Sequence, residues 1–157
     1  MDAHPFRTAW QTRNLDDWAA ALAPDVVLHS PLIQAPFVGR EVAVELYGTL
    51  FEVLGNVDIT HESSDGDSHA FFWRAQLGAR SIEGTDLLRY DEHGQIAEVT
   101  VLLRPLVAIA TFAAAVGPPL AAKQNPVKGV LARVLTMPLR SLFLAIDAIS
   151  TRVGQRG

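Results

Sequence analysis

The sequence contains no cysteine. Disulfide bonds, thiolate nucleophiles and cysteine-ligated metals are therefore excluded, and the absence fits a reducing compartment. Lysine is absent from residues 1–117, where seven Arg stand against sixteen Asp and Glu and give a net charge of −9. An acidic body of this kind argues against nucleic-acid binding as the main role. Residues 118–157 carry six basic residues against Asp147 alone, so this basic tail is a separate element that needs its own explanation.

Long hydrophobic runs are missing too. The longest stretch without a charged residue, 105–122, only touches the lower limit of about 17–18 residues for a membrane span. Gly117-Pro118-Pro119 interrupts this stretch, so we expect a buried helix near 106–116 that is too short to cross a bilayer. Residues 1–5 lack the basic start and apolar stretch of a signal peptide, and we expect a cytoplasmic protein.

Motifs for metals, phosphates and nucleophiles are also absent. The five histidines form no His-x3-His pair, which would be typical of a metal site. No Gly-rich phosphate loop is present, and Ser30 precedes Pro31 without the G-x-S-x-G context of a serine nucleophile. We therefore expect neither a metal nor a cofactor.

What the sequence does contain is a succession of helices followed by strands. Its 157 residues, 49% of them hydrophobic, suffice for one globular domain with a full core. Asn14 is the expected cap of a second helix that ends at Pro24. The other predicted helices lie near 6–13 and 40–54, and the predicted strands near 26–29, 57–63, 68–77, 81–90 and 96–103. This order indicates an α+β fold in which helices cover one face of a curved antiparallel sheet and leave a cavity.

The tail forms an amphipathic pattern from 126 to 153, with Pro138 as the expected kink or division. Such a helix could pack on its own domain or on a second copy of the chain, which is the simplest reading. It could also close over the cavity, or lie on an anionic membrane surface through its basic residues.

One carboxylate lies where a core residue is expected. Counting by twos along the predicted strand 81–90, Asp86 shares a face with Ile82, Gly84, Leu88 and Tyr90. Burial makes an ionised carboxylate costly and raises its pKa, and a neutral carboxylic acid can donate a hydrogen bond to a developing oxyanion. The alternative is a structural Asp held by backbone N–H groups or by an Arg.

Three segments of the sequence resemble the NTF2-like superfamily, which is also called SnoaL-like or ketosteroid-isomerase-like. They are residues 23–31 (Ala-Pro-Asp-Val-Val-Leu-His-Ser-Pro), 38–41 (Val-Gly-Arg-Glu) and 85–96 (Thr-Asp-Leu-Leu-Arg-Tyr-Asp-Glu-His-Gly-Gln-Ile). The resemblance implies a cone-shaped α+β domain over 1–105 with a pocket for a small, largely apolar or carbonyl-containing ligand. It also implies a homodimer. Residues 106–157 lie outside the resemblance, and we expect them to form a helical extension. The superfamily includes isomerases, cyclases, epoxide hydrolases, dehydratases and non-catalytic binders, so fold alone does not fix the activity.

The strand and turn at 85–96 are most similar to those of bacterial ketosteroid isomerases. That resemblance implies that Asp86 is the protonated carboxyl of the oxyanion hole and that Tyr47 supports it. The family's oxyanion tyrosine falls at Phe6, however, and its catalytic aspartate base falls at Ser30. Classical ketosteroid isomerisation is therefore not expected.

His29 is the remaining candidate base, because a histidine near its ordinary pKa of about 6.5 accepts protons readily. Strand alternation points it away from the face of Ser30, so a bulge would be needed to turn it inward; the alternative is an ordinary strand-end histidine. We expect Trp10, Trp18, Phe71, Phe72 and Trp73 in the core. The expected pocket lining is Phe6, Trp10, Trp18, Ser30, Trp73 and Val101.

Two hypotheses follow from the sequence. The first is a cofactor-independent isomerase-, cyclase- or hydratase-type enzyme, with Asp86, Tyr47 and His29 or a water acting on the substrate. The second is a non-catalytic ligand-binding module, or a protein- or membrane-interaction module that uses the basic C-terminal helix.

Overall fold

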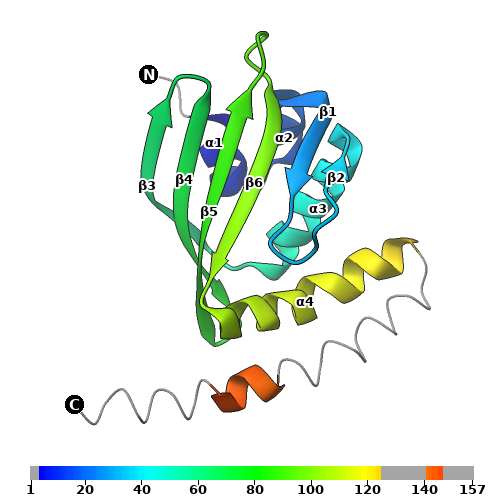
Figure 1. Ribbon diagram of the computed structural model, residues 1–157, viewed down its shortest axis with the longest axis vertical. Coiled ribbons are helices and arrows are strands. Elements are labelled where there is room, and N and C mark those ends of the chain that lie inside the picture. Colours follow the sequence, from blue (N-terminus) through cyan, green and yellow to red (C-terminus); the bar gives the residue numbers. More distant parts are fainter. Residues whose placement is uncertain (1–3, 125–140, 147–157) are drawn as a thin grey trace. The chain divides into compact units, whose positions relative to one another are not determined.

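The computed structural model describes residues 4–124 and 141–146 (Figure 1). The chain divides into two compact units, Met1–Leu103 and Arg104–Gly157. The elements before Pro105 are α1 (Pro5–Thr12), α2 (Leu15–Ala21), β1 (Leu22–His29), β2 (Phe37–Val38), α3 (Arg40–Val53), β3 (Val57–Asp65), β4 (Ser68–Leu77), β5 (Arg80–Tyr90) and β6 (Ile96–Arg104). Helices followed by a run of strands confirm the predicted α+β class.

The strands form one sheet in the order β2-β1-β6-β5-β4-β3. β4 pairs antiparallel with β3 and β5, whereas β1 runs parallel to β6. Figure 1 shows α1, α2 and α3 together on one face of this curved sheet. The face that these helices cover is the one that holds the core.

The helices begin where the sequence provides capping groups. His4 caps α1 by accepting the Phe6 N–H at its Nδ1 (3.1 Å), and Pro5 occupies the first helical position. Asn14 caps α2 as predicted, because its Oδ1 accepts the Asp16 N–H at 2.9 Å. Between the two helices, Arg13 adopts a left-handed conformation with φ 54°. The chain therefore turns sharply from α1 into α2.

The register of β4 and β5 follows from a two-residue hairpin. Leu77 pairs with Arg80, and Gly78 supplies the positive φ (61°) at the first loop position. This hairpin sets Trp73 directly opposite Gly84 and Phe71 directly opposite Asp86. The burial along β5 alternates, with the predicted inner residues Ile82, Gly84, Asp86 and Leu88 all buried.

The core of this unit is rich in aromatic rings that come from several elements. Phe6 stacks on Phe71 with ring centroids 4.6 Å apart, and Trp18 lies 4.7 Å from Tyr47. Trp10 lies 4.7 Å from Phe51. Ring packing thus joins α1 to β4 and joins the three helices to one another.

Several expectations were wrong in detail. Phe72 is 43% exposed, because it alternates with Phe71 and Trp73 and therefore faces outward. β1 begins at Leu22, and Pro24 lies within it at a register irregularity, where a strand tolerates a proline. β2 has only two residues and was not predicted.

The second unit contains α4 (Leu106–Gln124), which continues through Pro118 and Pro119. The prediction that these residues end the helix near 116 was wrong. Proline fixes φ near the helical value, but it has no N–H to donate and its ring crowds the preceding turn, so Pro118 and Pro119 weaken α4 without ending it. Residues 141–146 are helical, while the rest of the predicted helix 126–153 lies outside the described residues. Within the described part of the chain, no helix is both long and apolar enough to cross a membrane.

Candidate functional site

Asp86 lies on the inner face of β5 and is only 2% exposed. The Tyr47 hydroxyl, from α3, donates a hydrogen bond to Asp86 Oδ1 at 2.8 Å. The Trp73 indole Nε1–H, from the neighbouring strand β4, donates to Asp86 Oδ2. We call these three residues the Asp86 cluster. The Asp86 carboxyl thus accepts hydrogen bonds from side chains of α3 and β4. Among the described residues, neither an Arg nor a backbone N–H group holds this carboxyl.

Opposing effects set the protonation of Asp86. Burial raises the pKa of its carboxyl, while the hydrogen bonds from Trp73 and Tyr47 lower it, and the outcome is a pKa of about 6. Burial, together with the charge and hydrogen bond of Asp86, raises the pKa of Tyr47 well above its ordinary value. At pH 7 the carboxyl is therefore mostly ionised and the tyrosine is a neutral donor. A carboxyl with this pKa exchanges its proton close to neutral pH, whereas the sequence led us to expect a neutral acid there.

Aromatic side chains surround the Asp86 cluster. Phe6 is fully buried, at the position where the resemblance to ketosteroid isomerases would place a tyrosine. Trp10 lies 6.4 Å from the ring of Trp73, and Trp18 packs on Tyr47. The Nε1 atoms of Trp10 and Trp18 are buried and have no hydrogen-bond partner among the described residues. The carboxyl therefore lies in an apolar environment, which is the cause of its raised pKa.

The other predicted site residues are engaged elsewhere. His29 Nε2 lies 3.3 Å from Glu98 Oε1 on the adjacent strand β6, and its side chain is 42% exposed. Ser30 Oγ accepts the Leu32 N–H at 3.1 Å within its own turn. Val101 is partly buried on β6. The structure thus brings Asp86, Tyr47 and Trp73 into direct contact, and it gives His29 a carboxylate partner of its own.

A second polar cluster, which the sequence did not reveal, lies beside Phe71. His4 Nε2 is hydrogen-bonded to the Tyr90 hydroxyl, and the His4 ring lies 4.7 Å from that of His69. His69 Nε2 is 3.3 Å from Glu62 Oε2, and Arg7 is hydrogen-bonded to the same carboxylate. We call these five residues the His4 cluster. Strand alternation placed Tyr90 on the face of Asp86, but no sequence signal linked Tyr90 or His69 to His4.

The electrostatics of the His4 cluster follow from its partial burial and its cations. Burial lowers the pKa of His4 to about 4, with further lowering by the charges of His69 and Arg7. Burial also lowers the pKa of His69 and raises that of Tyr90 to about 12. At pH 7 the His4 ring is therefore neutral. Since its Nδ1 accepts the Phe6 N–H, the ring proton is assigned to Nε2, which donates to Tyr90.

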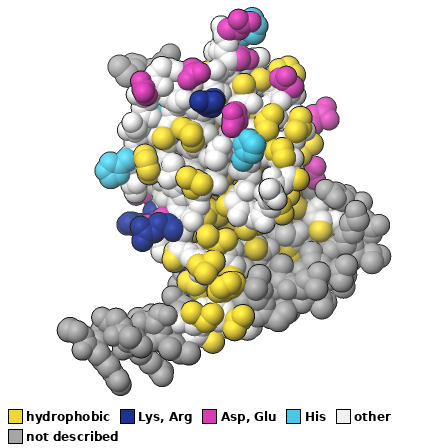
Figure 2. All heavy atoms as spheres, viewed as in Figure 1, with side chains coloured by type: hydrophobic (Ala, Val, Ile, Leu, Met, Phe, Trp, Pro, Cys, Tyr) yellow, Lys and Arg dark blue, Asp and Glu magenta, His cyan; other side chains and the backbone are white. Residues whose placement is uncertain are grey.

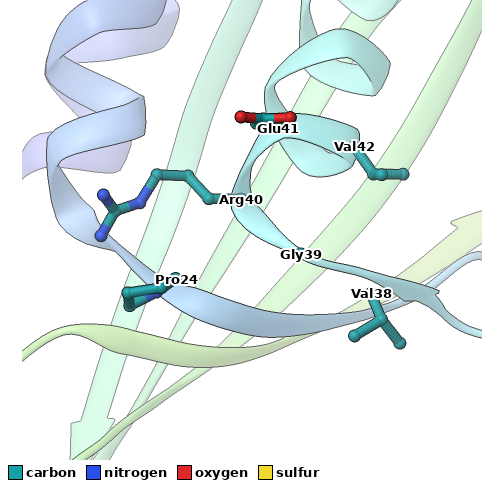
Figure 3. Close-up of a pocket in the computed structure, with 6 residues that line it drawn as sticks. All are labelled: Pro24, Val38, Gly39, Arg40, Glu41 and Val42. Atoms are coloured by element: carbon teal, nitrogen blue, oxygen red, sulfur yellow. The ribbon is translucent and has the colours of Figure 1, made fainter.

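A hollow of about 370 Å³ lies on the surface of the first unit beside the start of α3 (Figure 3). It is lined by Pro24, Val38, Gly39, Arg40, Glu41 and Val42. The hollow includes no member of the Asp86 cluster.

Within residues 4–124 and 141–146, no three His, Asp or Glu side chains are arranged to hold a metal ion. Figure 2 shows hydrophobic side chains interspersed with charged ones on the face of the molecule in view.

Comparison with known proteins agrees with this architecture. The family model of the SnoaL-like domain matches residues 3–99. A steroid delta-isomerase from Pseudomonas aeruginosa has a similar structure, with a TM-score of 0.70 and 26% identity over 76% of this chain and 88% of that one. An uncharacterized protein with a cystatin-like fold from Silicibacter pomeroyi gives a TM-score of 0.71 and 19% identity over 82% and 93% of the two chains.

A putative ketosteroid isomerase from Kribbella flavida is also similar, with a TM-score of 0.54 and 22% identity over 64% of this chain and 76% of that one. No curated protein matches the sequence. The family model covers well over half of the chain, and the sheet, its helices and the predicted cone architecture agree with it. The chain therefore belongs to the SnoaL-like family, which shares the NTF2-like fold with ketosteroid isomerases.

Proposed function

We propose that this protein binds a small, largely apolar, carbonyl-containing molecule and acts on it with isomerase-, cyclase- or hydratase-type chemistry, using Asp86 as the acid. The supporting observation is the position of the Asp86 carboxyl. It is buried among aromatic rings, and its pKa of about 6 lies close to neutral pH. General acids and bases work best when their pKa lies near the working pH. Similarity to a steroid delta-isomerase at 26% identity supports the same class of chemistry.

In this proposal, the minor fraction of Asp86 that is protonated at pH 7 is the active form, and its carboxyl donates a hydrogen bond to the substrate oxygen. Negative charge that develops on that oxygen is stabilised because the site is apolar and the donor is held in place. Tyr47 fixes the orientation of the carboxyl through Oδ1. Proton transfer at carbon then falls to a water or to His29, which lies beside Glu98 of the adjacent strand. Neither Phe6 nor Ser30 provides the group that ketosteroid isomerisation would need, so the proposed reaction differs from it.

Turnover of a panel of enones, epoxides and cyclisable polyketides by the wild type and by Asp86→Asn tests the proposal. Asn keeps the shape of the side chain but cannot give up a proton, so turnover should fall at least about tenfold. Glu83→Gln is the matched control, because it removes a carboxylate from the opposite face of the same strand. Equal turnover by wild type and Asp86→Asn, or no turnover of any panel member by the wild type, would count against catalysis.

A second candidate is a non-catalytic ligand-binding protein. It is favoured by the hydrogen bonds that already occupy both Asp86 oxygens, and by the engagement of Ser30 within its own turn. Tight binding of panel members without turnover would support it.

The expected homodimer, the cytoplasmic location and the role of the basic tail remain predictions. Sedimentation would determine the state of assembly.

The membrane version of this second candidate concerns the basic tail. Flotation with anionic liposomes can compare the full chain with a variant that carries Arg133→Gln and Arg140→Gln. Loss of flotation in the variant would support membrane contact through charge. Equal flotation of the two proteins, or none by either, would argue against it.

A further inference from the structure

The bond between Trp73 and Asp86 depends on a glycine. Trp73 lies directly opposite Gly84 in the β4–β5 ladder. A Cβ added at Gly84 would overlap three atoms of the Trp73 indole, namely Cζ2, Cε2 and Cη2. The indole therefore lies across the backbone of residue 84, in the space that any other residue would fill. From there its Nε1 reaches Asp86, two residues further along the same face of β5.

We propose that Trp73 is a positioning residue for Asp86, whose indole N–H stabilises the ionised carboxylate, and that Gly84 provides the space that this contact requires. The inference rests on the proposed function only in giving Asp86 a chemical role. Trp73 would touch the carboxyl and act through it. Without this contact the carboxyl would hold its proton up to a higher pH, because one of the two hydrogen bonds that favour the ionised form would be lost.

The groups that face Asp86 are few, so the effect of Trp73 can be isolated. Tyr47 from α3 is the other hydrogen-bond donor. The side chains of α1 and α2 in this region, Phe6, Trp10 and Trp18, are uncharged and buried. His4 and His69 pack on Phe71, which is the cross-strand partner of Asp86, and both have lowered pKa values.

Of the two hydrogen bonds that lower the pKa of Asp86, the one from Trp73 has the larger effect. A hydrogen bond to a charged group favours that form by enough to move a pKa by about 1 to 2 units. Removal of the indole N–H should therefore raise the pKa of Asp86 by about 1 unit or more. The hydrogen bond from Tyr47 would then be the only one left to counter the effect of burial on the pKa of Asp86.

Carboxyl ¹³C NMR of the full chain measures this directly, with the Asp86 signal assigned by its loss in Asp86→Asn. Trp73→Phe keeps an aromatic ring and removes the N–H, so the Asp86 midpoint should move upward. Trp10→Phe is the matched control, since it removes a buried indole N–H without a recorded partner and should leave the midpoint unchanged. Gly84→Ala should raise the midpoint as well, because the indole is displaced. An unchanged or lowered midpoint in Trp73→Phe would overturn the proposal.

A second measurement uses the wild-type protein, so its result does not depend on whether a variant folds. The indole Hε1 resonance of Trp73 should shift with pH at the same midpoint as the Asp86 carboxyl, while those of Trp10 and Trp18 should not follow it. If the Trp73 resonance does not change at the midpoint of Asp86, the two side chains are not hydrogen-bonded and the proposal is wrong. Both measurements are made without ligand. Failure of the turnover assays would therefore leave this inference standing, and its own failure would not decide whether the protein is an enzyme.

Discussion

The inner face of the sheet carries two polar clusters, and burial acts on them in opposite directions. In the Asp86 cluster burial raises the pKa of an acid to about 6. In the His4 cluster it lowers the pKa of a base to about 4. Both shifts have one physical cause, because a poorly solvated site disfavours whichever form is charged. The two clusters differ in their hydrogen-bond partners: Asp86 accepts two hydrogen bonds that favour its charge, whereas His4 accepts one at Nδ1 that requires it to be neutral.

Phe71 lies between the clusters. It pairs with Asp86 across the β4–β5 ladder, stacks on His69 with centroids 4.3 Å apart and lies 4.6 Å from the ring of His4. The His4 cluster is partly open to solvent, while the Asp86 cluster is closed. The comparison shows that the same sheet face holds one closed cluster around a buried carboxyl and a second, partly open cluster whose His4 caps the start of α1.

The largest effect on stability should come from filling the space above Gly84. Gly84→Val would force the Trp73 indole out of its place, and overpacking of this kind costs about 3 kcal/mol of unfolding free energy. Chemical denaturation measures the loss. Thr85→Val is the control, because residue 85 lies on the other face of β5 and should change stability by less than about 0.5 kcal/mol. Similar losses in both variants would contradict the close approach of Trp73 to Gly84.

Removal of the Tyr47 hydroxyl should have a smaller effect that depends on pH. Tyr47→Phe should lower the unfolding free energy by about 2 kcal/mol at pH 8, because a hydrogen bond to a charged carboxylate is lost. At pH 4 the loss should be about 1 kcal/mol, since the acceptor is then neutral. Denaturation at the two pH values checks this. A loss that is the same at both would show that Asp86 does not change its charge in this range.

The pH dependence of stability should separate the two clusters. The folded pKa of Asp86 is raised above 3.8, so its contribution to stability is complete below about 3.8 and is lost as pH rises through about 6. The folded pKa of His4 is lowered below 6.5, so its contribution is complete above about 6.5 and is lost as pH falls through about 4. The two effects oppose each other between pH 4 and 6.

Substitution should remove one effect at a time. Asp86→Asn should make the unfolding free energy fall more steeply as pH drops from 6 to 4, because the opposing effect of Asp86 is removed. His4→Asn keeps an oxygen that can cap α1 but does not titrate, so the same fall should become shallower. Denaturation midpoints between pH 4 and 8 give both slopes. Parallel curves for the wild type and the two variants would contradict the assignments.

The smallest effect should come from the ion pair at the edge of the His4 cluster. Arg7→Gln removes a partly exposed partner of Glu62 and should change stability by less than about 1 kcal/mol. It should nevertheless raise the pKa of His4, because the charge of Arg7 contributes to its lowering. Imidazole NMR measures the shift. Arg74→Gln, which breaks the pair with Glu83 on the outer face, should leave His4 unchanged.

Local patterns predicted much of the fold. Alternation alone placed Asp86 on the buried face of β5, and capping chemistry at Pro5 and Asn14 located the starts of α1 and α2. The errors arose where tertiary context overrides a local rule. Pro118 lies inside α4, and Pro24 lies inside β1, although each was expected to end an element.

The site was less predictable because its contacts are long-range. Tyr47 was linked to Asp86 only through resemblance, and Trp73 was expected merely to line a pocket. Its bond to Asp86 depends on the β4–β5 register, which the Gly78 hairpin sets and which could have been inferred from that turn. The bond between His4 and Tyr90 joins residues 86 positions apart and has no sequence signature. Neither periodicity nor motif spacing reports which side chains meet across the core.

The central claim is that the Asp86 carboxyl is sheltered and gives up its proton close to neutral pH. A ¹³C titration of this carboxyl in the wild-type full chain, without ligand, tests the claim most directly. We predict a midpoint of about 6. A midpoint near 3.8, the ordinary value for an aspartate, would contradict the claim.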